Sequence, residues 1–281
     1  MSFRSKRLLH KMKSESYKDN ISHTFLKPNQ KQNLFSEDPV YNDNIKKIDN
    51  GQIVTLDIVS KPDNQLLYFH GGAFTAPMNA DQLEFITNLA QRTNSQLKII
   101  DFPLLLSHKS TEIIDFCVKA FDECVADSLP INLVGDSAGA YLMLQVATRR
   151  AAEVNRIVAI SPWLDLELAN SSVHHREADD VFLELDVLQT IGKQFDDGLV
   201  EGDVVDLFME ENLSGLKIQL FYGDNEMLVP DNQIFVDAMN NAVESEIEVV
   251  EFNDIFHDYI LWTKLSETKK TEKLIAEFLG R

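Results

Sequence analysis

The residue with the clearest capacity for chemistry is a serine between two glycines, in the segment Gly135-Asp136-Ser137-Ala138-Gly139. The apolar run Ile131–Val134 before it predicts a buried strand. Residues 141–147 after it carry apolar side chains at helical spacing. A serine on a sharp turn between a strand and a helix is typical of a nucleophile elbow, in which a strained backbone exposes the hydroxyl. Taken alone, the five residues also fit an ordinary turn with Ser137 as a helix N-cap.

A serine hydroxyl becomes an effective nucleophile only when a base removes its proton and an acid orients that base. In enzymes with such an elbow the acid and the histidine follow the serine in the chain, each after a strand. Of the seven histidines, only His257 follows a predicted strand in the last part of the chain. Asp224 and Glu226 share the loop after the preceding strand, and either could accept the imidazole N–H. Aspartate is the better turn former, which slightly favours Glu226 as the functional acid.

Attack on a carbonyl creates an oxyanion, which needs preorganised N–H donors. The N–H of Ala138 is one candidate, because this residue follows the nucleophile. Gly71 and Gly72 come directly after a predicted strand and offer backbone donors with no side chain in the way. The sequence therefore predicts acyl transfer, with Gly71, Gly72 and Ala138 as the oxyanion hole.

The elements that must position these residues alternate along the chain. Strands are predicted at residues 53–59, 65–70, 97–102, 131–134, 155–161, 217–222 and 246–252, and helices at residues 81–92, 111–126, 231–243 and 266–279. This alternation predicts an α/β fold with a mostly parallel central sheet and helices on both faces. The turn signal at residues 61–64 leads us to expect that the first two strands form a hairpin.

Two segments fall outside the alternation. Residues 1–45 are polar and weakly periodic, which predicts an N-terminal arm on a domain formed by residues 46–281; whether the arm joins a cap is left open. Residues 166–212 predict a small acidic helical cap over the sheet, because the part 176–211 has twelve acids against two basic residues yet keeps apolar positions. A solvated helical insertion with no role in substrate choice is the alternative.

Composition narrows the class of partner. A chain of 281 residues with 44% hydrophobic and 25% charged residues is ordinary for a globular protein. The formal net charge of -19 argues against nucleic acid, which requires a basic surface. It also disfavours anionic membranes, and no stretch approaches the length of a transmembrane helix.

The cysteines and histidines predict neither a disulfide nor a metal site. Cys117 and Cys124 lie seven residues apart on one predicted helix. That spacing separates them by about 10 Å along the axis, too far for a disulfide. Two reduced cysteines suit a cytoplasmic protein. No Cys/His spacing resembles a zinc site, and we expect no metal or cofactor.

At this point the motifs resemble a known family. The segment His70-Gly71-Gly72, followed by Gly135–Gly139, is similar to the α/β-hydrolase fold and, within it, to the hormone-sensitive-lipase-like esterases. Residues 161–165 (Ser-Pro-Trp-Leu-Asp) and the pair His257-Asp258 extend the resemblance, which covers roughly residues 50–281. It implies hydrolysis of carboxylic esters, commonly with short acyl chains, without metal or cofactor.

The resemblance also bears on the acid and on the glycine turn. The family's Gly-x-x-acid-x-Leu loop, laid on Gly223–Leu228, implies Glu226 as the acid. Family members more often carry Asp there, so Asp224 stays an alternative. Ala73 stands where the glycine turn usually has a third Gly.

We therefore expect a serine hydrolase that cleaves a small-molecule ester through Ser137, His257 and Glu226 by way of an acyl-enzyme. No nucleic acid partner and no stable membrane insertion are expected, and a homodimer is left open. An amidase or peptidase on the same fold is one alternative, since the acyl-transfer machinery is common to both. A hydrolase-like binding protein without catalysis is the other.

Overall fold

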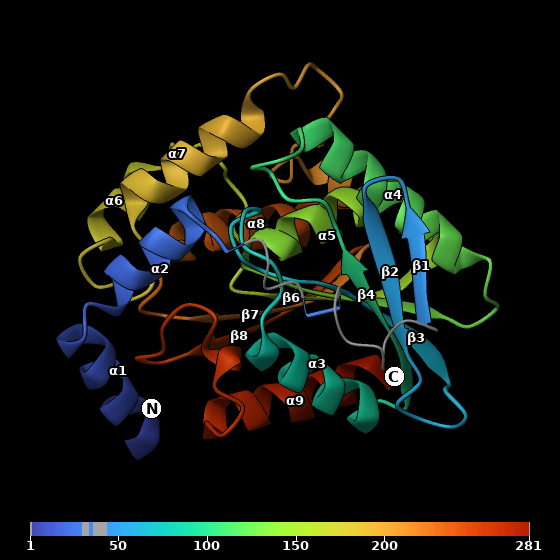
Figure 1. The fold of residues 1–281 in the computed structure, drawn as a ribbon, viewed down its shortest axis with the longest axis horizontal. Helices are drawn as coiled ribbons and strands as arrows, with labels where there is room; N and C mark the ends of the chain where they lie inside the picture. Colours follow the sequence, from blue (N-terminus) through green and yellow to red (C-terminus); the bar gives the residue numbers. More distant parts are fainter. Residues whose placement is uncertain (1, 30–33, 36–43, 281) are drawn as a thin grey trace.

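The computed structural model describes residues 2–29, 34–35 and 44–280, and eight strands form one sheet in the order β1-β2-β4-β3-β5-β6-β7-β8 (Figure 1). The strands are β1 Ile45–Ile48, β2 Gly51–Leu56, β3 Asn64–Phe69, β4 Ser95–Asp101, β5 Ile131–Asp136, β6 Val154–Ile160, β7 Lys217–Gly223 and β8 Glu246–Phe252. The pairs β1–β2 and β2–β4 are antiparallel and the other pairs are parallel. The predicted mostly parallel sheet is confirmed.

Helices cover both faces of this sheet. In chain order they are α1 Phe3–Ser14, α2 Tyr17–Leu26, α3 Ala80–Arg92, α4 Ser110–Val125, α5 Ser137–Arg149, α6 Ser171–Arg176, α7 Leu185–Asp196, α8 Val229–Asn241 and α9 Ser266–Leu279. Helices α4, α5 and α8 lie on one face and α3 and α9 on the other (Figure 1). Helix α3 shows why the sequence folds this way: Phe85, Ile86 and Leu89 form its buried stripe, and an Asn79–Gln82 capping box satisfies its first N–H groups.

The predicted hairpin between the first two strands is wrong. Strand β2 pairs with β4, where Leu56 lies opposite Leu97, and β3 lies between β4 and β5. The turn signal at residues 61–64 marked a real chain reversal, but a turn does not determine which strands pair. Here β2 pairs with the strand that follows helix α3, and β3 takes a position in which all of its residues but the first are buried.

The N-terminal arm packs against the segment 166–212. Helices α2 and α7 lie side by side (Figure 1), and the hydroxyl of Ser22 donates a 2.7 Å hydrogen bond to Glu184 Oε2. Lys18 Nζ donates to the carbonyl of Glu177 at 3.0 Å. The arm is also held to α9, because Ser5 Oγ donates to Glu267 Oε2 at 2.8 Å. The predicted arm residues 30–33 and 36–43 lie outside the described residues.

Two further expectations concern single elements. Cys117 and Cys124 are free and buried on α4, so the prediction that no disulfide joins them is confirmed. Within the described ranges, no helix combines the length and apolar character needed to cross a membrane.

Candidate active site

The turn between β5 and α5 holds Ser137 in a strained conformation. Strand β5 ends at Asp136 and helix α5 begins at Ser137, whose φ is 49°. A Cβ on Gly139 would lie 2.2 Å from the carbonyl oxygen of Phe69, and one on Gly135 would lie 2.8 Å from Ala140 Cα. The two glycines therefore let the helix sit directly against the sheet. No side chain caps the start of α5, which leaves its first N–H groups for an anion.

Three buried side chains from separate strand ends form a continuous hydrogen-bonded series. His257 Nε2 lies 2.9 Å from Ser137 Oγ, and His257 Nδ1 lies 3.0 Å from Glu226 Oε2. Because a carboxylate only accepts, Nδ1 carries the hydrogen, and in the neutral imidazole Nε2 accepts from the serine hydroxyl. This arrangement has the geometry of a nucleophile, a base and an acid that orients the base.

In the loop after β7, the side chain of Glu226 is buried, whereas that of Asp224 contacts the turn after β8. Glu226 is fully buried, and its Oε1 accepts from Ser161 Oγ at 2.7 Å and from the N–H of Gly223 at 2.6 Å. The carboxylate of Asp224 instead accepts from the N–H of Asp254, in the turn after β8. Of the two acids in this loop, the one in contact with the imidazole is Glu226.

The segment 166–212 holds this acid loop from outside. Arg176, at the end of α6, donates to the carbonyls of Asp224 and Glu226. Asp180 Oδ2 accepts from the N–H of Met227 at 2.9 Å, while its Oδ1 accepts from the N–H of Phe182 at 2.8 Å. Movement of this segment would therefore also move the residues beside the imidazole.

The glycine turn after β3 lies against the elbow. A Cβ on Gly71 would lie 2.4 Å from Asp136 Oδ2, and Gly72 has a φ of 125°. Ala73, where the resemblance leads one to expect glycine, adopts a φ of 51°. An alanine in this left-handed region costs about 1 kcal/mol, so the fold keeps the turn in spite of the missing glycine. Gly71 and Gly72 line a cavity of about 650 Å³.

Opposing effects act on the titration of His257. Burial acts to lower its pKa, but the neighbouring carboxylates of Asp258 and Glu226 outweigh burial and raise the pKa well above 6.5. Asp258 Oδ2 lies 3.4 Å from His257 Nε2, on the nitrogen that also faces Ser137. Burial raises the pKa of Asp258, and the charge of His257 opposes that rise.

A second buried acid lies behind the glycine turn. Asp136 is fully buried and accepts from the hydroxyl of Tyr68 at 2.5 Å and from Gln82 Nε2 at 2.9 Å. Burial, followed by repulsion from Asp258, raises the pKa of Asp136 to about 7. The backbone of Gly71 is therefore packed against a carboxyl group whose charged form is disfavoured by burial.

Sequence reasoning missed the functional surroundings of the three side chains. Ser161 belongs to the segment that resembles the family, but nothing local indicates that its hydroxyl contacts Glu226, sixty-five positions away. Asp258 is adjacent to His257 in sequence, yet a neighbour along the chain commonly points the other way. Its position beside Nε2 follows from a φ of 50°, which the sequence pattern does not reveal.

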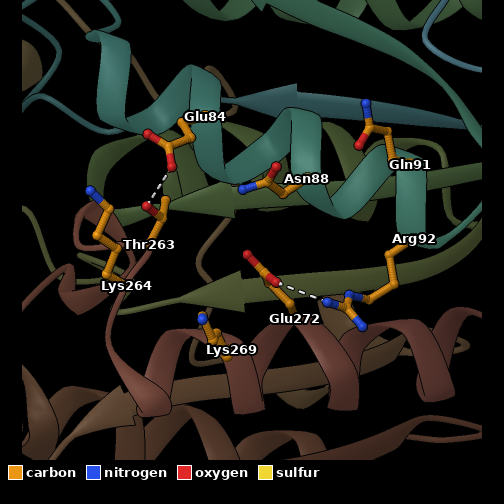
Figure 2. A pocket seen from close by; sticks show the side chains of 8 residues that line it. All are labelled: Glu84, Asn88, Gln91, Arg92, Thr263, Lys264, Lys269 and Glu272. Atoms are coloured by element: carbon orange, nitrogen blue, oxygen red, sulfur yellow. Dashed lines mark hydrogen bonds and ion pairs between the residues drawn. The ribbon is translucent and has the colours of Figure 1, made fainter.

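A second hollow, of about 550 Å³, lies between α3 and α9 (Figure 2). Its acids already have partners: Glu84 accepts from the hydroxyl of Thr263 at 2.6 Å, and Glu272 pairs with Arg92 at 3.4 Å. None of the candidate catalytic residues lines it. Among the described residues, no group of three or more His, Cys, Asp or Glu side chains is placed to hold a metal ion.

Comparisons with known proteins identify a family and relatives to which this chain is similar. The profile of a family described as alpha/beta hydrolase fold matches residues 66–261. An esterase of Acinetobacter venetianus is 27% identical over 225 residues, which is 76% of this chain and 73% of that protein. Esterase LipU of Mycobacterium tuberculosis is 26% identical over 231 residues, 76% of each chain.

Solved structures extend the likeness to almost the whole chain. The hormone-sensitive-lipase homologue EstE7, from a metagenome library, has a TM-score of 0.78 at 19% identity, covering 100% of this chain and 98% of its own. An esterase from the bacterial hormone-sensitive lipase family has a TM-score of 0.76 at 18% identity, covering 99% and 98%. At these identities the similarity concerns the fold.

Proposed function

The chain belongs to the α/β-hydrolase fold family, and we propose that it is an esterase of the hormone-sensitive-lipase-like kind. In this proposal it cleaves small-molecule carboxylic esters through Ser137, His257 and Glu226. The observation that carries the proposal is the pair of hydrogen bonds that His257 makes, 2.9 Å to Ser137 Oγ and 3.0 Å to Glu226 Oε2. One imidazole thus contacts both a hydroxyl and a buried carboxylate.

The proposed reaction proceeds by acyl transfer. Ser137 Oγ attacks the ester carbonyl carbon while His257 Nε2 takes the hydroxyl proton, and Glu226 stabilises the imidazolium that forms. Collapse of the tetrahedral intermediate breaks the carbon–oxygen bond, and His257 returns the proton to the leaving alcohol. Water, deprotonated by the same imidazole, then releases the acid from Ser137.

The N–H groups of Gly71, Gly72 and Ala138 are the proposed oxyanion hole. Ala138 occupies the first turn of α5, where N–H groups have no partner within the helix. Gly71 and Gly72 line the cavity beside the elbow. The positive end of the α5 dipole adds to the stabilisation of a negative oxygen at this point.

We further propose that α2 and the segment 166–212 act together as a cap. The support is the set of hydrogen bonds that joins them and the lining of one cavity by Tyr17 of α2 and by Phe182. Short acyl chains are the proposed preference. A series of p-nitrophenyl esters of increasing acyl length would reveal it as a fall in kcat/KM with length.

The test of the reaction is Ser137→Ala assayed with p-nitrophenyl acetate, with Ser60→Ala, at an exposed loop serine, as the matched control. The expected result is loss of turnover by several orders of magnitude in Ser137→Ala, with no labelling by a fluorophosphonate, and unchanged turnover in the control. Full activity in folded Ser137→Ala would refute the proposal. Faster cleavage of a matched anilide than of the ester would indicate an amidase instead.

A further inference from the structure

The cavity beside the glycine turn has an aromatic wall built from three separate segments. Tyr17 comes from the N-terminal arm, Phe182 from the segment 166–212 and Trp262 from the region before α9. The ring of Tyr17 lies 5.6 Å from that of Phe182 and 5.9 Å from that of Trp262. The rings of Phe182 and Trp262 are 6.5 Å apart. All three rings line one cavity of about 650 Å³.

The charged residues that line this cavity, among those that the structure describes, are all acidic. Among the lining residues that the structure describes, the charged side chains are Asp81 and Asp258, and neither Lys nor Arg is present. Asp258 is only 4% exposed, and its Oδ1 has no hydrogen-bond partner. A buried carboxylate oxygen without a partner is costly, so a neutral apolar ligand would leave this cost in place, whereas a cation would offset it.

The carboxylate of Asp258 also lies close to the imidazole of His257. His257 Nε2 must deliver its proton to the oxygen of the departing alcohol. Asp258 Oδ2 lies 3.4 Å from that nitrogen, and the ring of Phe182 lies 5.3 Å from the imidazole. Two of the lining residues thus lie beside the imidazole that protonates the leaving alcohol.

We propose that this cavity binds the alkylammonium group of an amino-alcohol ester, an inference that rests on the proposed function. Aromatic faces attract an alkylated ammonium through their quadrupoles, and the two carboxylates supply the opposite charge. The reaction itself is unchanged: the acyl carbon–oxygen bond breaks, the oxygen takes the proton from His257, and the alcohol leaves with its positive charge. The Asp81 carboxylate, which is exposed on α3, attracts the cation toward the cavity.

An isosteric pair of substrates tests the inference. Acetylthiocholine and S-(3,3-dimethylbutyl) thioacetate have nearly the same shape, but only the first is charged, and one thiol reagent reads both products. We expect kcat/KM to be about tenfold higher for the cation in the unsubstituted enzyme. In Asp258→Asn we expect the ratio of the two kcat/KM values to fall severalfold, because the rings and Asp81 remain but the buried carboxylate is lost. The ratio cancels any effect of this substitution on the chemical step itself.

Matched variants separate the cavity from the overall negative charge. Asp237→Asn removes the same single charge at an exposed site on α8, and we expect the ratio to stay as in the unsubstituted enzyme. Trp262→Leu should lower the ratio severalfold, and Trp262→Phe should restore most of it because a ring remains. Equal ratios in Asp258→Asn and Asp237→Asn would overturn the inference, as would a ratio of one in the unsubstituted enzyme.

Different results would refute the proposed ester hydrolysis and the proposed ammonium site. Hydrolysis of the neutral thioester that depends on Ser137 but shows no preference for the cation would overturn only the ammonium site. If neither thioester is cleaved, equilibrium binding of tetramethylammonium still tests the site. Saturable binding weakened about tenfold in Asp258→Asn would uphold it, and absence of binding would refute it.

Discussion

Ser161 binds one carboxylate oxygen of Glu226, and the other oxygen faces His257. Ser161 Oγ donates to Glu226 Oε1 at 2.7 Å, leaving Oε2 free to face His257 Nδ1 at 3.0 Å. With the N–H of Gly223 also on Oε1, the carboxyl group cannot rotate without losing two hydrogen bonds. Ser161 thereby orients the carboxylate that, in the proposed mechanism, orients His257.

The first prediction separates Glu226 from Asp224. In Glu226→Gln an amide replaces the carboxylate that stabilises the imidazolium, and we expect kcat to fall by roughly ten-thousand-fold. The control is Asp224→Asn, which removes the charge but keeps an oxygen that can accept from the Asp254 N–H; kcat should stay within about tenfold of the unsubstituted value. The measurement is kcat of both variants with p-nitrophenyl acetate. A larger fall in kcat for Asp224→Asn than for Glu226→Gln would identify Asp224 as the acid.

The second prediction concerns the pH dependence of catalysis. His257 must be neutral to act as a base, and its pKa is raised well above 6.5, so kcat/KM should rise with pH and reach half its limit above 6.5. Asp258 is the chief group that raises this pKa. Asp258→Asn should therefore move the midpoint to lower pH, while Asp81→Asn should move it less. An unshifted midpoint in Asp258→Asn would contradict the assigned contact with Nε2.

Local patterns predicted the elements that are decided locally. Strand β8 and helix α9 have the predicted boundaries, 246–252 and 266–279, because alternation, helical spacing and flanking polar residues all lie within the window. The elbow at Ser137 was likewise visible, since its two glycines are required by backbone contacts with near neighbours in space.

What the sequence could not predict depends on contacts between distant segments. The partner of β2 is chosen by the whole sheet, and a turn at residues 61–64 carries no information about β4. The aromatic wall combines Tyr17, Phe182 and Trp262, whose separations along the chain leave no periodic signal. Asp224 and Glu226 could not be separated fully, because only the direction in which each side chain points decides between them.

The third prediction tests the glycine turn. In Gly71→Ala the new methyl group would lie 2.4 Å from Asp136 Oδ2, so the turn must shift and carry its N–H away from the oxyanion. We expect kcat to fall by roughly a hundredfold to a thousandfold. Gly215→Ala is the control, because that residue has a φ of 77° with no atom within 4 Å of a new Cβ. It should lose about 1 kcal/mol of stability and keep full activity per folded molecule.

The fourth prediction is a stability measurement on Asp136, whose pKa rises from 3.8 to about 7 on folding. Between these values the folded protein binds more protons than the unfolded chain. The free energy of unfolding should therefore fall as pH rises, by up to about 1.4 kcal/mol per pH unit from this group. Asp136→Asn keeps an oxygen that accepts from Tyr68, but it places its NH₂ group against the NH₂ group of Gln82. A pH-independent loss of stability is therefore also expected.

The diagnostic quantity for Asp136 is the slope of the unfolding free energy against pH, from urea titrations at several pH values. Asp136→Asn should remove this group's contribution and make the slope less negative across the window. Asp237→Asn, at an exposed position on α8, should leave the slope unchanged. Parallel curves for Asp136→Asn and the unsubstituted protein would mean that the carboxyl group is already ionised in the fold, and that Tyr68 and Gln82 stabilise its charge.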